Sequence, residues 1–170
     1  MVVVGTFHTI GNGSSLGGIG DLIDGIFETG KDSQEQTTNG SFTFNKNGSG
    51  VSEVRFNKVV NEFATKNPYN ERSISSYEFT YEVTDIGEIS LFIKQNSLVG
   101  EIIDGPRKGK SFNTEIIMGD MVCPHLEGNL SPDGLTILLS TKEQFYTKTI
   151  YSDEIEIDEI SNYSIIAVRG

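Results

Sequence analysis

Apolar and polar side chains alternate strictly along residues 77–84, and this two-residue period restricts the fold more than any other feature. The apolar members are Tyr77, Phe79, Tyr81 and Val83, and each is followed by Glu or Thr. Successive side chains of a β-strand point to opposite faces, so the period predicts a half-buried strand. After the turn residues 85–87 the alternation resumes over 88–94, which predicts the second strand of a hairpin.

Turn residues punctuate the rest of the chain in the same way. Asn47-Gly48 separates residues 42–44 from 51–56, and this pair is typical of a hairpin with a type I′ turn. Gly and Pro at 104–109 and 131–134 predict two further hairpins. The tail is again rich in β-branched and aromatic residues. The predicted strand regions are 2–10, 26–29, 42–56, 77–94, 98–118, 123–140 and 146–168, the last broken near 152–153 and 161–162.

These regions hold about nine to eleven predicted strands and very little helix. The two helical candidates, 21–25 and 57–65, are short. The glycine-rich segment 11–20 and the polar segment 30–40 are predicted to be long loops.

Short strands joined by tight turns pair antiparallel, and their apolar faces need a common interior. We therefore predict an all-β fold, a single antiparallel up-and-down β-barrel over residues 1–170 with one or two short helical turns. Closure into a barrel removes the exposed edges of an open sheet. A β-sandwich is the alternative. The length of 170 residues fits one domain, and 36% hydrophobic residues can supply its core.

The charge balance excludes several partners. The chain has 24 acidic and 13 basic residues, a formal charge of −11, which repels nucleic acid and anionic membranes. No apolar run reaches the roughly 20 residues of a membrane-spanning helix. Because no signal-peptide pattern is present, we expect a cytoplasmic protein; a secreted or periplasmic one whose signal peptide was replaced by Met1 is the alternative. The oligomeric state is left open.

No motif indicates a cofactor or a metal. The segment 11–20 lacks the lysine of a phosphate-binding P-loop. His8 and His125 are the only histidines, too few for a typical zinc site. Cys123 lies two residues before His125, so both would share one face of a strand. We interpret Cys123 as a small buried hydrophobe, with a Cys–His nucleophile pair as the alternative.

Five carboxylates gather in residues 153–159, where they alternate with Ile155 and Ile157. Oxygen ligands of this kind suit calcium, but the spacing of a calcium-binding loop is missing. The alternation instead predicts an acidic outer face on an edge strand.

An aromatic set on the predicted strands is the candidate ligand site. Inside a barrel of about eight strands, the space is either filled by side chains or holds one small ligand, and the sequence leaves both open. The predicted ligand-binding residues are Phe44, Phe56, Tyr77, Phe79 and Tyr81. Tyrosine hydroxyls favour a cavity, since a buried O–H needs a partner.

The turn segments 40–50, 98–109 and 127–136, with the strand 77–83 between them, resemble small bacterial lipocalin-like β-barrels over about residues 40–140. They are also similar to allene-oxide-cyclase-like barrels. The resemblance implies a barrel that binds a hydrophobic small molecule and, in some members, cyclises a polyene or polyketide chain. The lipocalin Gly-x-Trp motif is missing, because the chain has no Trp, and no catalytic residue is carried over.

Three functions follow from these patterns. The first is binding of a small hydrophobic or amphipathic molecule inside the barrel. The second is a cofactor-independent cyclase or isomerase, in which a Tyr or Glu would stabilise developing charge on a confined hydrophobic substrate. The third is a structural or interaction protein with a filled core.

Overall fold

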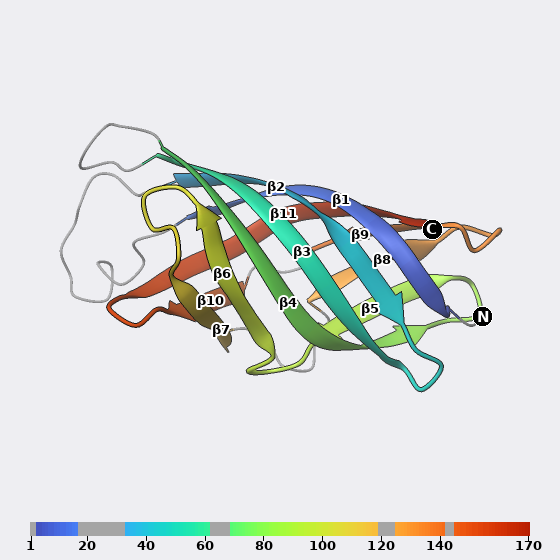
Figure 1. The fold of residues 1–170 in the computed structure, drawn as a ribbon. Coiled ribbons are helices and arrows are strands. Elements are labelled where there is room, and N and C mark those ends of the chain that lie inside the picture. The colour runs from blue at the N-terminus through green and yellow to red at the C-terminus, as the bar shows by residue number, and fades with distance from the viewer. Residues whose placement is uncertain (1–2, 17–32, 62–68, 119–124, 142–144) are drawn as a thin grey trace.

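The computed structural model describes residues 3–16, 33–61, 69–118, 125–141 and 145–170 (Figure 1). All regular elements in these ranges are β-strands. None of the described residues belongs to a helix with the length and apolar character that a membrane crossing requires. The strands are β1 Gly5–Leu16, β2 Ser33–Phe44, β3 Ser49–Asn61, β4 Tyr69–Val83, β5 Glu88–Ile93, β6 Leu98–Asp104, β7 Ser111–Met118, β8 Leu126–Leu130, β9 Thr136–Ser140, β10 Phe145–Ile150 and β11 Ile155–Arg169.

The strands form one closed antiparallel β-barrel, as predicted. Two different rings of hydrogen-bonded strands close it, and they share some of their strands. A first ring of eight strands runs β1-β2-β3-β4-β5-β8-β9-β11 and returns to β1. A second ring leaves β4 through β6, β7 and β10 to reach β11, so it also has eight strands. The long strands β1 to β4 and β11 belong to both rings (Figure 1).

The second ring is where the fold departs from the predicted up-and-down order, because β5 pairs with β8 and not with β6. The cause is strand length. β4 has 15 residues and would extend about 50 Å at the usual rise, far longer than any of its short partners. Its residues 79–83 therefore pair with β5 and its residues 72–76 with β6. β11 divides in the same way, with 164–168 beside β9 and 155–160 beside β10.

Three of the hairpin turns share one geometry. The amide of Gly48 donates to the carbonyl of Asn45, that of Gly87 to Thr84, and that of Gly134 to Ser131. The glycine at the end of each turn has a positive φ of 70–86°. This is a four-residue turn ending on a left-handed glycine, so the predicted type I′ turn at Asn47-Gly48 is wrong, although the hairpin itself is confirmed.

Two predicted loops and one predicted helix are wrong in the parts that the structure describes. Residues 11–16 belong to β1, 33–40 to β2, and 57–61 to β3. The first two of these segments were not recognised as strands because their residues are polar. Their backbones nevertheless pair on both sides, and a side chain at Gly40 would meet the carbonyl oxygen of Glu53 at 2.0 Å. The helical candidate 21–25 and the strand candidate 26–29 lie outside the described residues.

The predicted break at Ser161-Asn162 is also wrong, because β11 continues through it. The register with β1 shifts there: Asn12 faces Ser164, whereas Ser14 faces Ser161. One strand therefore carries an extra residue, a β-bulge that bends the strand without ending it.

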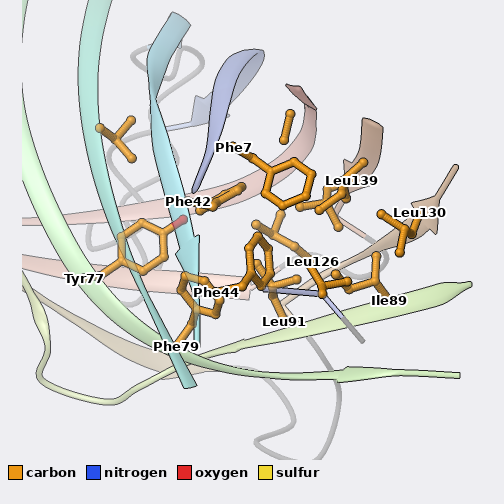
Figure 2. Close-up of a cluster of buried hydrophobic side chains, with 14 residues drawn as sticks. Phe7, Phe42, Phe44, Tyr77, Phe79, Ile89, Leu91, Leu126, Leu130 and Leu139 are labelled. Carbon is orange, nitrogen blue, oxygen red and sulfur yellow. The ribbon is translucent and has the colours of Figure 1, made fainter. Parts of the chain in front are cut away.

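The first ring is filled by a solid core (Figure 2). Its centre is an edge-to-face aromatic group in which Phe44 contacts Phe7, Phe79 and Tyr81, with ring centroids 5.0–5.5 Å apart. Aliphatic side chains of β5, β8 and β9 close around it: Ile89, Leu91, Leu126, Leu130, Ile137 and Leu139. The side chains of this core are at most 7% exposed.

Candidate functional site

A cavity of about 200 Å³, partly open to solvent, lies within the second ring. Phe42, Val54, Tyr77 and Leu126 belong to both the cavity wall and the solid core, so they form the floor of the cavity. The rest of the wall comes from strands around the second ring, among them β6, β7, β10 and β11. The sequence left open whether the barrel interior is a cavity or a filled core. The structure has both, because the first ring is filled and the second is hollow.

The five predicted ligand-binding residues divide between these two environments. Phe56 and Tyr77 line the cavity. Phe44 and Phe79, each 1% exposed, lie in the solid core and do not line it. Tyr81 packs against Phe44, and its hydroxyl lies 2.7 Å from the carbonyl oxygen of Val3 and 2.5 Å from that of Asn45. The alternation identifies inward-facing residues, but it carries no information on their height along the barrel.

Part of the cavity wall is apolar. It is formed by Phe56, Leu98, Ile102, Ile116 and Ile165 from four different strands. A ring or short chain placed against this part would be removed from water, which is worth about 25 cal/mol for each Å² of apolar surface.

Between these residues the wall carries hydroxyl groups from threonine and serine. Thr114 and Thr149 hydrogen-bond to each other, with 3.0 Å between their Oγ1 atoms. Ser75, which also lines the cavity, has a buried Oγ without a hydrogen-bond partner among the described residues. Buried polar atoms are normally satisfied, so this hydroxyl is available to a ligand or a water molecule.

Asp158 is the one acid of the cavity wall without an ion pair in the described part of the chain. It lies on β11 opposite Thr147 and is 8% exposed. Burial, opposed by the charge of Lys58, raises the pKa of Asp158 to about 6. The predicted acidic outer face is therefore wrong for Glu156 and Asp158, which line the cavity, whereas Ile155 is 58% exposed. Asp153 and Glu154 are exposed, as predicted. Alternation alone does not say which face of β11 turns inward; in the structure residues 155–160 pair with β10, and Glu156 and Asp158 face the cavity.

Arg107 holds the neighbouring carboxylates in place. From the loop between β6 and β7, its Nε and Nη2 donate to the two oxygens of Glu71 at 2.9 and 2.7 Å. Its Nη1 donates to Glu156 and, at 3.3 Å, to Glu154. The guanidinium also lies 4.7 Å from the centre of the Tyr151 ring. Glu71 is only 3% exposed, so this bidentate pair neutralises a carboxylate that the fold has buried.

The pKa shifts around Arg107 follow from burial and these charges. Burial opposes the positive charge of Arg107, but hydrogen bonds to Glu71 and the charge of Glu156 outweigh it and hold the pKa above its ordinary range. Burial, followed by the charge of Glu156, raises the pKa of Tyr151. Burial and then the charge of Asp158 raise the pKa of Tyr163. Both phenols stay neutral at neutral pH and remain hydrogen-bond donors.

His125 precedes β8 and hydrogen-bonds to β5, near the point where the two rings separate. Its Nδ1 accepts a hydrogen bond of 2.8 Å from the amide of Ile93, and its own amide donates to Leu91 at 2.9 Å. Burial lowers the pKa of His125, which favours the neutral ring. Cys123 lies outside the described residues, so the Cys–His pair stays a hypothesis. His8 is exposed on the outside of β1, and the described residues contain no group of three or more potential metal ligands.

The sequence did not single out Asp158, Arg107 or the hydroxyl wall as a site. Arg107 could have been noticed as a cation in the Gly- and Pro-rich turn 105–109, but its partners are 36 to 49 residues away in sequence. The six threonines lie on five different strands or segments and leave no local pattern.

Replacing Asp158 with asparagine is expected to change how stability depends on pH. The folded-state pKa of about 6 lies above the ordinary 3.8, so the folded protein holds this proton more tightly than the unfolded chain does. The resulting stability is complete below about pH 4 and is lost as the pH rises through 6, on the order of 3 kcal/mol in all. Asp158→Asn removes this loss.

Urea unfolding of both proteins at several values between pH 4 and pH 7.5 measures this effect. The free energy of unfolding of Asp158→Asn should gain on that of the unchanged protein as the pH rises. Parallel pH curves for the two proteins would contradict the burial of an ionisable Asp158.

Comparison of the chain with protein-family models, with curated proteins and with solved structures gives no match. The closed barrel is consistent with the lipocalin-like resemblance, which stays a prediction, and the function is argued from the cavity itself.

Proposed function

We propose that the protein binds one small amphipathic molecule, about the size of a single ring, in the cavity of the second ring. The observation that carries the proposal is a cavity whose wall combines apolar side chains with hydroxyl and carboxyl groups. Such a combination buries most of a ligand while a few polar groups orient it.

The volume limits the size of the ligand. The cavity measures about 200 Å³. An apolar cavity of roughly 150 Å³ accommodates benzene. A ring with one short polar substituent therefore fits, whereas the long polyene chains implied by the resemblance require more space.

Filling the cavity should abolish binding without unfolding the protein. Ser75 faces the cavity, and Ser76 follows it on β4 with its side chain on the opposite face of the strand. Ser75→Phe places a phenyl ring in the space proposed for the ligand. Ser76→Phe adds the same ring outside and serves as the matched control.

Ligand-detected NMR with benzyl alcohol, indole and benzylamine tests this prediction. At least one probe should bind the unchanged protein and Ser76→Phe, and binding to Ser75→Phe should be lost by a factor of ten or more. The proposal fails if no probe binds the unchanged protein, or if Ser75→Phe binds as well as Ser76→Phe.

Catalysis in the same cavity is the second candidate, favoured by Asp158. A buried carboxyl group with a pKa of about 6 can take up and release a proton near neutral pH. This property suits a cofactor-independent isomerase whose substrate the cavity confines. If a bound molecule is recovered unchanged after incubation at any protein concentration, this candidate is excluded.

A further inference from the structure

The charges around the cavity do not balance. Three carboxylates line it, those of Glu71, Glu156 and Asp158. Arg107 pairs with the first two, through both oxygens of Glu71 and one oxygen of Glu156. Lys58 also lines the cavity and acts on Asp158 through its field, without forming an ion pair with it. With all groups ionised, three negative charges face two positive ones.

Asp158 carries the unmatched charge into the cavity. It is more than nine-tenths buried, and none of the described residues donates a hydrogen bond to it. An ionised carboxylate in this position keeps its acceptor capacity for a bound molecule. Leaving such a charge unpaired is costly, so a partner that supplies a positive charge gains the corresponding stabilisation.

The neighbours of Asp158 fit a cationic group better than an anionic one. Tyr163 is neutral and close enough for the charge of Asp158 to raise the pKa of its phenol. The faces of aromatic rings attract cations. Threonine hydroxyls, of which Thr147 lies directly opposite Asp158 on β10, can accept the remaining N–H groups of an ammonium. An anion would instead meet the uncompensated carboxylate of Asp158.

We infer that the ligand is a small amine, held with its ammonium group against Asp158 and its apolar body against Phe56, Ile102 and Ile116. This inference rests on the proposed function, since it identifies the chemical class of the molecule in the same cavity. The hydroxyl groups orient the ammonium, and the net negative charge of the cavity discriminates against carboxylates.

Three probes of nearly equal size separate the possible ligand classes. Benzylamine is positively charged, benzyl alcohol is neutral, and benzoate is negatively charged at pH 7.5. Calorimetric titration should give a dissociation constant for benzylamine at least about tenfold below that for benzyl alcohol, since charge-assisted hydrogen bonds are about twice as strong as neutral ones. Benzoate should bind most weakly.

Variants identify the group responsible. Asp158→Asn should weaken benzylamine binding by about tenfold or more and change benzyl alcohol binding by less than about threefold. Asp153→Asn removes the same charge from an exposed residue that pairs with Lys110 and does not line the cavity. It should therefore leave both affinities unchanged.

The outcomes separate this inference from the proposed function. If benzylamine and benzyl alcohol bind equally well and Asp158→Asn alters neither, the cavity binds ring-sized molecules but does not select amines, and the inference is wrong. If benzoate binds most tightly, the inference is likewise overturned. If none of the three binds, the inference fails; the proposed function fails with it only if indole does not bind either.

Discussion

Replacing Arg107 with alanine is expected to lower the free energy of unfolding by about 3–5 kcal/mol, the usual result of removing one member of a buried ion pair. The reason is Glu71, which is 3% exposed and receives two hydrogen bonds from the guanidinium. Without Arg107 this carboxylate would be a buried charge with no cation beside it. Urea unfolding at pH 7 measures the loss.

Two further variants separate charge from packing. Glu71→Gln in the Arg107→Ala background removes the buried charge, so it should restore part of the lost stability. Arg72→Ala breaks the exposed pair of Arg72 with Asp104, whose side chains are more than half exposed, and should have little effect. If Arg107→Ala is no more destabilising than Arg72→Ala, the Arg107 cluster does not support the barrel.

Replacing Phe44 with alanine is expected to cost about 3–5 kcal/mol, whereas Phe56→Ala should cost clearly less. Phe44 is 1% exposed and packs edge-to-face against four other aromatic rings. Phe56 is half-buried, and one side of its ring borders empty space. In a protein of this length, the loss at Phe44 corresponds to a melting temperature lower by roughly 10–15 °C.

The same two variants should have the opposite order of effects on ligand binding, with Phe56→Ala now the more damaging. Phe56→Ala removes part of the apolar wall and should weaken binding of a ring-sized probe. Phe44→Ala, measured at a temperature where the variant is folded, should bind the probe as the unchanged protein does. Equal effects of both variants on stability and on binding would contradict the division into a filled and a hollow ring.

The sequence predicted the fold class because alternation records which side chains face inward. It found the hairpins of residues 42–56 and 77–94 for this reason. It missed the polar ends of β1 and β2, because Gly, Ser, Thr and Asn show no hydrophobic period there. The sequence could not predict the two rings either. They depend on which half of β4 and of β11 each short strand pairs with.

The candidate site was predicted only in part. Phe56 and Tyr77 were correctly placed in the interior, where they line the cavity. Phe44 and Phe79 also face inward, but they lie in the filled core. Asp158 was assigned to the outside, since acidic residues usually face water. In the cavity this preference does not hold, because its wall includes an acidic side chain. Only the three-dimensional pairing of β11 shows that Asp158 faces inward.

X-ray diffraction from a crystal under xenon pressure tests the hollow ring most directly, because xenon occupies apolar cavities and is visible by its anomalous scattering. We expect xenon in the second ring, beside Phe56, Ile102 and Ile116, and none between Phe44 and Phe79. Side chains filling the space between β3 and β7, with no xenon there, would contradict the cavity on which the proposed function depends.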